Sequence, residues 1–382
     1  MIAREGASVQ APESEAAVDW DAIAAETVSL PGGAEIDLER VQRFAREIAE
    51  GRRHLEANRL RAAPRLPGPG DLDVLEGFAP DERARFERSG RAAIERGEVG
   101  VAVLAGGMAT RFGARVKGVA EALGGRSFLE IKRARARRFG PLPFVVMTSF
   151  ASHRPTLEHL GARDLLADTC LFKQSASLRL TPLGGMFRGA DGRLSPYAPG
   201  HGEFGAALRA SGTLAELDRR GVRLLVLSNV DNLGAELDPA IVGYHLSHGM
   251  PLSAEVTQTL PGDVGGAPVR VDGRLQLVEG LRLPRGFELE SVPFVNINSF
   301  AISLAALERD YPLTWFYVEK SVDGRRAVQL ERIVGELTAF LDTAFLEVPR
   351  RGPSARYYPV KTPEDLEALR SEPDLALRFA SV

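Results

Sequence analysis

Lysine is rare in this chain, and the positions where it occurs are candidates for phosphate chemistry. Only five of the 48 lysine and arginine residues are lysines. An ammonium is a compact point charge and a guanidinium is broad and planar, so the two differ most where one cation sits against one phosphate oxygen. Lys117 follows a glycine-rich stretch, and Lys361 lies in Tyr-Pro-Val-Lys near the C-terminus. We take both as candidate phosphate ligands and interpret Lys132, beside a run of arginines, as a chance survivor.

The stretch ahead of Lys117 has the composition of an anion-binding turn. It reads Leu-Ala-Gly-Gly-Met-Ala-Thr-Arg-Phe-Gly over residues 104–113. Glycine lets backbone N–H groups approach an anion because no Cβ is in the way. The spacing matches neither G-x-G-x-x-G nor G-x-x-x-x-G-K-[ST], which argues against the dinucleotide fingerprint and the Walker loop. A purely structural turn is the alternative, but Thr110, Arg111 and Lys117 favour phosphate binding.

The elements that must position these residues alternate between strand and helix patterns. Val99–Ala105 is a short apolar run of the kind that forms a buried parallel strand, and similar runs cover 143–148 and 222–228. A helical pattern covers 128–138, between the first two runs. This alternation predicts an α/β fold with a mixed, mainly parallel sheet flanked by helices.

Four further segments complete the expected architecture. Residues 18–62 and 80–96 read as helices on either side of a Pro- and Gly-rich break. Residues 252–302 are rich in strand signals, with a hairpin expected around Asp272-Gly273. Residues 327–342 have the apolar spacing of an amphipathic helix.

Composition and charge exclude several classes of protein. The net charge of −3 argues against a nucleic-acid binder, which usually shows a basic surface. No stretch of about 20 apolar residues is present, so we expect no membrane span. The single cysteine, Cys170, cannot form an internal disulfide, and residues 1–17 resemble a disordered tail more than a signal peptide. We therefore expect a cytoplasmic protein.

Several motifs, taken in order, resemble the UDP-sugar pyrophosphorylases, which include the eukaryotic-type UTP–glucose-1-phosphate uridylyltransferases and the UDP-N-acetylhexosamine pyrophosphorylases. The glycine-rich loop resembles the family's Gly-Gly-x-Gly-Thr-x-x-Gly followed by Pro-Lys, with Ala109 and Val116 as departures. Phe-Lys-Gln at 172–174 and Pro-Gly-His-Gly-Glu at 199–203 are similar to the next two motifs, with Glu203 in place of an aspartate. The strongest match is Ser-Asn-Val-Asp-Asn-Leu-Gly-Ala at 228–235, which closes an apolar strand.

The resemblance continues through the second half of the chain. Leu-Val-Glu at 277–279, Phe-Val-Asn-Ile-Asn at 294–298, Lys320, Gln-Leu-Glu at 329–331 and Arg-Tyr-Tyr-Pro-Val-Lys at 356–361 follow the family's order. For Gln329 and Glu331, a purely structural role is an equal alternative to a role in the site. One departure from the family is large: the glucose enzymes usually carry a C-terminal left-handed β-helix, and we expect none here, because the sequence stops soon after Lys361.

The resemblance implies a Rossmann-like nucleotide-diphospho-sugar transferase fold and a role for each matched residue. Arg111, Lys117 and Lys361 would act on the phosphates, and Asp231 would bind Mg²⁺, a metal that prefers oxygen ligands. The implied nucleotide-binding residues are Leu104, Ala105, Gly106, Gly107, Gln174 and Gly200, and those for the sugar phosphate are His201, Asn229, Glu279, Asn296, Asn298 and Lys320.

The implied reaction joins UTP and a sugar-1-phosphate, with glucose-1-phosphate preferred, to give UDP-sugar and pyrophosphate. A UDP-N-acetylhexosamine pyrophosphorylase and a non-catalytic nucleotide-sugar binder are the alternatives. The oligomeric state is open, with a monomer slightly favoured. We expect a tail over 1–17, a helical segment over 18–97, a catalytic core over 98–345 and a C-terminal segment over 346–382 that packs on the core and supplies Lys361.

Overall fold

The apolar runs of the sequence form the middle of a large sheet in the computed structural model, which describes residues 18–107, 116–263, 265–372 and 378–379. Along the sheet the strands are β1 (Asp73–Val74), β16 (Thr343–Glu347), β10 (Leu252–Gln258), β13 (Phe294–Ser303), β9 (Leu224–Asn229), β2 (Val99–Leu104), β5 (Phe144–Thr148) and β6 (Thr169–Lys173). β13 is antiparallel to both of its neighbours, and the other adjacent pairs are parallel. The expected mixed, mainly parallel sheet is therefore confirmed.

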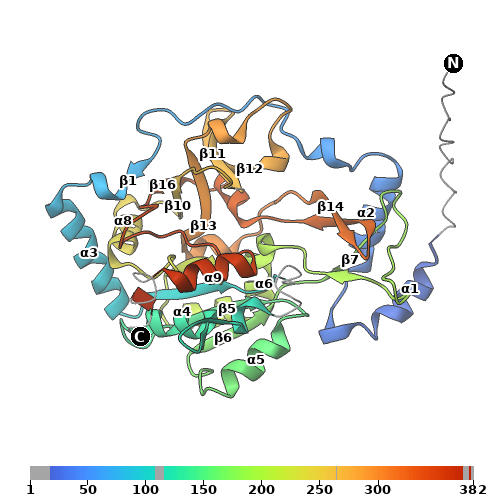
Figure 1. Cartoon of the computed structure of the whole chain (residues 1–382), viewed down its shortest axis with the longest axis horizontal. Coiled ribbons are helices and arrows are strands. Elements are labelled where there is room, and N and C mark those ends of the chain that lie inside the picture. The colour runs from blue at the N-terminus through green and yellow to red at the C-terminus, as the bar shows by residue number, and fades with distance from the viewer. Residues whose placement is uncertain (1–17, 108–115, 264, 373–377, 380–382) are drawn as a thin grey trace.

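Helices and short hairpins surround this sheet (Figure 1). The helices are α1 (Trp20–Thr27), α2 (Leu38–Ala49), α3 (Pro80–Glu95), α4 (Phe128–Arg137), α5 (His153–Gly161), α6 (Phe204–Ala210), α7 (Thr213–Arg219), α8 (Pro239–His248) and α9 (Pro363–Ser371). The two-stranded hairpins are β3 (Glu121–Leu123) with β4 (Arg126–Ser127), β7 (Ser177–Leu178) with β8 (Pro196–Tyr197), β11 (Gly266–Val271) with β12 (Arg274–Glu279), and β14 (Phe316–Val322) with β15 (Arg325–Glu331).

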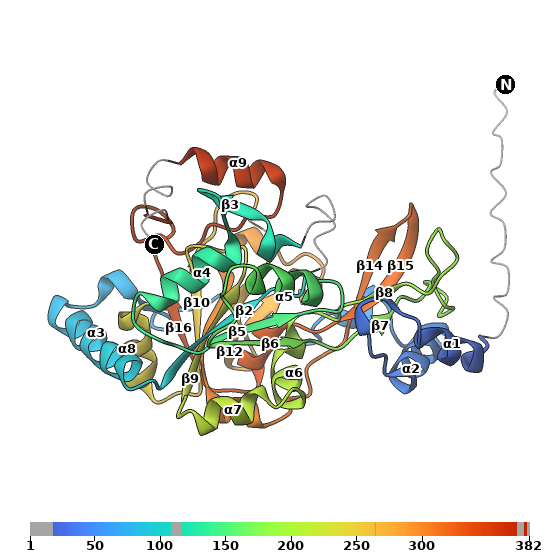
Figure 2. The same cartoon turned by 90° about the horizontal axis from the view of Figure 1, so that it is seen from below.

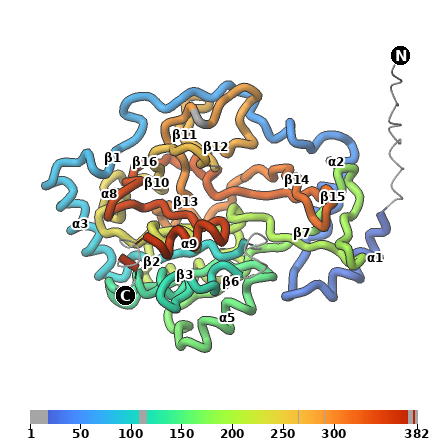
Figure 3. The backbone as a smooth tube through the Cα atoms, in the orientation of Figure 1, coloured from blue at the N-terminus to red at the C-terminus, as the bar shows by residue number. Residues whose placement is uncertain are grey.

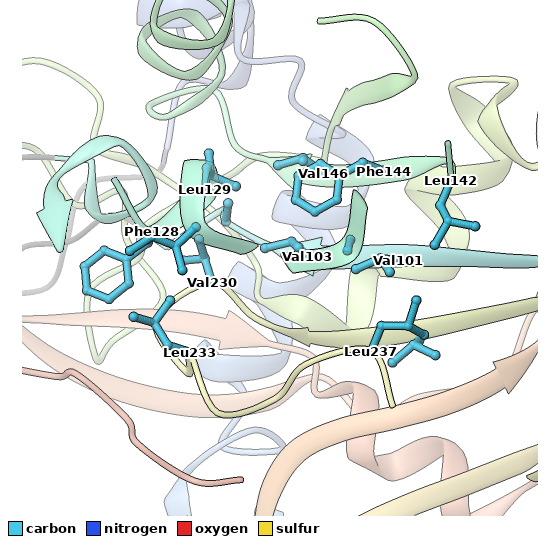
Figure 4. Packing of buried hydrophobic residues seen from close by; sticks show 14 of the residues in the cluster. Val101, Val103, Phe128, Leu129, Leu142, Phe144, Val146, Val230, Leu233 and Leu237 are labelled. Carbon is cyan, nitrogen blue, oxygen red and sulfur yellow. The ribbon is translucent and has the colours of Figure 1, made fainter. Parts of the chain in front are cut away.

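The central strands are buried on both faces because helices cover the sheet on both sides (Figure 2). Successive side chains of a strand point to opposite faces. Val101 and Val103 pack with Leu129 of α4 on one face, and Figure 4 shows this layer. Ala102 and Leu104 pack on the other face, in the cluster that contains the apolar residues of α6 and α7. This two-sided burial explains why β2 reads as a continuous apolar run.

The N-terminal part of the chain follows the outside of this core (Figure 3). After α2 it runs past β14, β11 and β16 before it enters α3. Asn58 exchanges two hydrogen bonds with the backbone of Tyr317 in β14, at 2.7 and 2.9 Å. Arg65 pairs with Arg270 of β11, and β1 adds to the sheet edge beside β16. The N-terminal segment therefore packs directly against the β14–β15 hairpin.

Two expectations about helices were wrong in part. Residues 327–342 contain most of strand β15 and a short 3₁₀ helix, Val334–Ala339, where an amphipathic helix was expected. A turn at Asp323 and Gly324, both at positive φ, pairs β15 with β14, and Val328 and Leu330 are buried there as strand residues. Residues 18–62 hold only α1, α2 and short 3₁₀ turns, because Pro31-Gly-Gly33 interrupts the helical pattern.

The hairpin expected at Asp272-Gly273 is confirmed. It joins β11 to β12, with both turn residues at positive φ. Within the described part of the chain, none of the helices has the length and apolar character needed to cross a bilayer.

Candidate active site

The carboxyl ends of β2 and β9 open into a cleft of about 920 Å³. These strands are parallel and Leu104 pairs with Asn229, so the loops that follow them leave the sheet at the same edge. Ligands of open α/β sheets bind at this edge. The expected site residues that line the cleft are Leu104, Ala105, Gly106, Gly107, Lys117, Gln174, Gly200, His201, Asn229, Asp231, Lys320 and Lys361.

Of the four other expected site residues, the structure describes three. Arg111 is outside the described residues. Glu279, Asn296 and Asn298 do not line this cleft, but Asn298 connects to it through a hydrogen bond of 2.7 Å from its Nδ2 to Asn229 Oδ1.

Lys117 and Asp231 form an ion pair in the cleft. Lys117 Nζ donates to Asp231 Oδ2 at 2.8 Å and to the carbonyl oxygen of Val360 at 2.7 Å. Both side chains are about four-fifths buried, with 19% and 18% exposed. One lysine therefore joins the glycine-rich loop, the end of β9 and the C-terminal segment, which are distant in the sequence.

Asp231 suits a magnesium ion that is shared with phosphate groups. No group of three or more His, Cys, Asp or Glu side chains with metal-binding geometry occurs among the residues that the structure covers. Mg²⁺ in phosphate sites commonly uses one or two carboxylates together with substrate oxygens and water, so a single carboxylate in a polar cleft fits the chemistry of such a site.

Gln174 forms the wall of the cleft beside the glycine-rich loop. Its Oε1 accepts a hydrogen bond of 3.1 Å from the backbone N–H of Gly200. A Cβ at Gly106 would lie 2.0 Å from Gln174 Nε2, so a larger residue there would displace the Gln174 amide. This close packing joins the ends of two motifs that were recognised separately in the sequence.

His201 is a neutral hydrogen-bond donor in the cleft. Its Nδ1 accepts a hydrogen bond of 3.0 Å from the backbone N–H of Val334, which leaves the ring proton on Nε2. Burial lowers the pKa of His201 to about 4, so the imidazole is uncharged near neutral pH. The flanking glycines allow this packing, because a Cβ at Gly202 would lie 2.5 Å from the backbone nitrogen of Ile333.

Glu203 has a structural environment. Its carboxylate forms an ion pair of 2.8 Å with Arg332 and accepts a hydrogen bond of 2.5 Å from the Ser175 hydroxyl. The side chain is buried. Glu203 thus connects the His201 loop to the segments that contain Gln174 and Arg332, which gives a physical reason for a longer acid at this position.

Asn298 has a strained backbone next to the cleft. It adopts φ of 54° inside β13, where the pairing with β10 shifts register. Its backbone N–H donates to Asn296 Oδ1 at 2.9 Å, and its own Oδ1 is buried with no hydrogen-bond partner among the described residues. Asparagine tolerates the left-handed region better than most residues, and such strain is concentrated at functional sites.

Glu279 at the end of β12 has a strongly shifted carboxyl group. Burial raises its pKa to about 7, and the positive charge of Lys361 partly opposes this rise. A Cβ at Gly266 would lie 2.7 Å from Glu279 Oε1, so the opposite strand closes over the group. Glu279 is therefore within electrostatic reach of Lys361, which lines the cleft.

The opposite wall of the cleft is the β14–β15 hairpin. Lys320 Nζ lies 3.4 Å from Glu331 Oε1. With its amide oxygen facing Arg179, Gln329 accepts from Arg179 at 2.7 and 2.8 Å and donates to Glu331 at 3.0 Å. Arg179 and Asp323 also line the cleft and were not recognised from the sequence. The Asp323-Gly324 turn signal could have located the hairpin, whereas nothing in the sequence singled out Arg179.

The interpretation of Lys132 as a chance survivor was wrong. Lys132 is buried in α4, and its Nζ donates to the Ser228 hydroxyl at 2.9 Å and to the carbonyl oxygen of Ala235 at 3.1 Å. Burial lowers the pKa of Lys132 to about 8, although nearby acids led by Asp231 oppose the shift. Lys132 therefore contacts both ends of the loop that carries Asp231.

Comparisons with known proteins agree with this arrangement. A family model described as UTP–glucose-1-phosphate uridylyltransferase matches residues 85–374. A UTP–glucose-1-phosphate uridylyltransferase from Solanum tuberosum is 31% identical over 70% of this chain and 60% of its own length. One from Hordeum vulgare is 30% identical over 80% of this chain and 65% of its own. The chain thus spans less than two thirds of the length of these relatives.

Solved structures show the same fold. A point mutant of UDP-glucose pyrophosphorylase from Leishmania major, in complex with UDP-glucose, superposes with a TM-score of 0.67 at 26% identity, over 86% of this chain and 74% of the other. The UDP-N-acetylglucosamine pyrophosphorylase from Trypanosoma brucei gives 0.70 at 20% identity, over 91% and 78%. The family resemblance and the expected nucleotidyltransferase fold are confirmed: the chain belongs to the UTP–glucose-1-phosphate uridylyltransferase family.

Proposed function

We propose that the protein transfers the uridylyl group of UTP to glucose-1-phosphate, giving UDP-glucose and pyrophosphate. The observation that carries this proposal is the convergence of Lys117, Asp231 and Lys361 on one cleft at the carboxyl edge of the sheet. The relatives that match over most of this chain bear the name of this activity, and UDP-glucose is the ligand in the Leishmania major structure.

The reaction requires charge stabilisation more than acid–base chemistry. An oxygen of the sugar phosphate attacks the α-phosphorus of UTP, the bond from this phosphorus to the oxygen that bridges to the β-phosphate breaks, and pyrophosphate leaves with those electrons. The attacking phosphate is already ionised near neutral pH. The obstacles are the approach of two polyanions and the charge on the leaving group, which fixed cations reduce.

Four charged side chains have proposed roles in this step. Lys117 and Lys361 would neutralise phosphate oxygens, and Arg111 would assist them at the β- and γ-phosphates. Asp231 would hold Mg²⁺, which supplies positive charge to the phosphates when bound. Release of Asp231 from its ion pair would make the Lys117 ammonium available to substrate.

The two ends of the cleft have different proposed ligands. Gln174, Gly200 and the Leu104–Gly107 turn would bind the nucleotide, and His201 would donate a neutral hydrogen bond to the sugar phosphate from Nε2. The proposed contacts to sugar and phosphate beyond it are Asn229, Glu279, Asn296, Asn298 and Lys320. The magnesium requirement, a cytoplasmic location, a monomeric state and the division at residues 17, 97 and 345 remain predictions.

A substrate panel tests this function. Purified protein with Mg²⁺ is given each of UTP, TTP, ATP and GTP with glucose-, galactose- or N-acetylglucosamine-1-phosphate, and pyrophosphate release is measured. We expect UTP with glucose-1-phosphate to be the fastest pair, with one UDP-glucose formed per pyrophosphate. A preference for N-acetylglucosamine-1-phosphate would move the protein to the alternative activity, and no release from any pair would contradict catalysis.

A further inference from the structure

The side chain of Asn232 makes a two-point connection between the Asp231 loop and the C-terminal segment. Its Nδ2 donates to the carbonyl oxygen of Arg356 at 3.0 Å, and its Oδ1 accepts from the backbone N–H of Tyr358 at 2.9 Å. Only 1% of the residue is exposed. Both partners are backbone groups, so the connection fixes the position of the chain itself.

The backbone pairing next to Asn232 is weak, which explains why the side-chain amide matters. Asn232 and Pro359 face each other in an isolated antiparallel bridge. The backbone N–H of Val360 donates to the carbonyl oxygen of Asp231 at 3.4 Å, which is a long hydrogen bond. The Asn232 amide supplies one donor and one acceptor to the neighbouring backbone groups. Aspartate lacks the donor and leucine lacks both groups.

Two further contacts show how closely the two segments fit. A Cβ at Gly234 would lie 2.7 Å from the backbone carbon of Arg356 and 2.8 Å from its oxygen. On the far side of Pro359, the carbonyl oxygen of Val360 accepts from Lys117. The segment is therefore fastened to the cleft edge immediately before Lys361.

Lys361 is fixed on its other side by the start of α9. Its backbone N–H donates to Asp365 Oδ2 at 2.7 Å, and Thr362 and Asp365 form a capping box. Lys361 is thus a short link between the Asn232 connection and a capped helix. Its backbone position relative to Asp231 depends on the register that Asn232 sets.

We propose that Asn232 is a positioning residue for the uridylyl transfer, acting through Lys361, without contact to either substrate. This inference rests on the proposed function. The Asn232 amide would affect the rate because it fixes the backbone position of Lys361. A displacement of a catalytic group by about 1 Å can cost on the order of 10² in rate.

A double-mutant cycle separates this role from a general loss of stability. We expect Asn232→Ala to lower kcat about tenfold or more while the Kd for UDP-glucose changes by less than about threefold. If Asn232 acts through Lys361, the same substitution in a Lys361→Ala background lowers kcat by less than about twofold. A purely structural role would give the same factor in both backgrounds.

Two further variants control for a general loss of stability and for a failure of Asn232→Ala to fold. Tyr244→Phe removes a partly buried hydrogen bond, from the Tyr244 hydroxyl of α8 to Asp73 at 2.8 Å, and neither residue lines the cleft. It should lower the unfolding midpoint and leave kcat unchanged. If Asn232→Ala fails to fold, Asn232→Ser keeps a hydroxyl in the space and should show the same dependence on Lys361.

Hydrogen exchange gives a readout that does not depend on activity. Loss of the Asn232 acceptor should speed exchange of the Tyr358 amide, with no change in the strands of the central sheet. Unchanged exchange, unchanged kcat or equal factors in the two backgrounds would each overturn the inference. If wild-type protein releases no pyrophosphate, the proposed function fails instead, and the exchange measurement still decides whether Asn232 holds the segment.

Discussion

Lys132 shows how one buried side chain can support a site that it does not enter. Its ammonium bridges Ser228, at the end of β9, and Ala235, after the Asp231 loop. The sequence could not reveal this role, because a lysine in a run of arginines looks like a solvated helix face. The sheet beneath α4 determines which face of this helix is buried. The local sequence pattern does not contain that information.

A pH prediction follows from the buried charge of Lys132. Its pKa falls from 10.5 to about 8 in the folded protein, so between these values the unfolded chain binds the proton and the folded protein does not. The unfolding free energy should therefore rise with pH across this range by about 3 kcal/mol from this group. The charged groups that act on it are Asp231, Glu236, Arg356 and Glu255.

The measurement compares wild-type protein with Lys132→Met by denaturant unfolding between pH 7 and 10.5. Other lysines and tyrosines titrate in both proteins and cancel in the difference. The loss of two hydrogen bonds in the variant adds an offset that does not vary with pH. A difference in unfolding free energy that stays constant across this range would contradict the assigned environment of Lys132.

Asp231 carries the second residue-scale prediction. Asp231→Asn should lower kcat on the order of 10²–10³-fold and flatten its dependence on magnesium concentration, because the proposed anionic metal ligand is lost. The matched control is Asp342→Asn, whose side chain is 78% exposed and does not line the cleft. A normal magnesium response in Asp231→Asn would show that the metal, if required, is held elsewhere.

At the scale of elements, a close crossing of two helices supports the Asp231 loop. A Cβ at Gly90 of α3 would lie 1.9 Å from the carbonyl oxygen of Pro239, and one at Gly243 of α8 would lie 1.8 Å from that of Phe86. α8 begins directly after the loop, so the packing of α8 against α3 limits where the loop ends.

Gly243→Ala should therefore destabilise the protein by about 2–3 kcal/mol, because the two helix backbones must separate. Gly161→Ala in α5 is the matched control, since its Cβ would meet only Leu166 Cδ1 at an ordinary 3.6 Å. The control should be neutral or more stable by up to about 1 kcal/mol. Equal unfolding midpoints for the two variants would contradict the close crossing.

The elements also show what local patterns can and cannot predict. The apolar run of β2 and the turn at Asp272-Gly273 carry their own signals, and both were predicted. Strand β15 was taken for a helix, because Leu330, Val334 and Leu337 recur at helical spacing and the partner strand β14 lies in a different segment. A short window of sequence does not show which distant segment a strand pairs with.

At the scale of the whole molecule, the cleft joins segments that are far apart in the chain. Asp231 could be predicted as a site residue because it closes an apolar strand, and Lys117 because it follows a glycine-rich turn. The rarity of lysine made Lys361 a candidate phosphate ligand, but its assignment to the same site as Asp231 rested on family resemblance, since nothing in its local sequence points to the end of β9. The contacts of Lys117 with Asp231 and Val360 supply the physical link.

Lys361 and the sheet edge that carries Asp231 are proposed to form one catalytic site. The most direct test is steady-state pyrophosphate release from UTP and glucose-1-phosphate with Mg²⁺, for wild-type protein, Lys361→Ala and the exposed-surface control Arg91→Ala. We predict that Lys361→Ala turns over on the order of 10²–10³-fold more slowly than the other two, with UDP-glucose still bound. Equal turnover by all three active proteins would contradict the account.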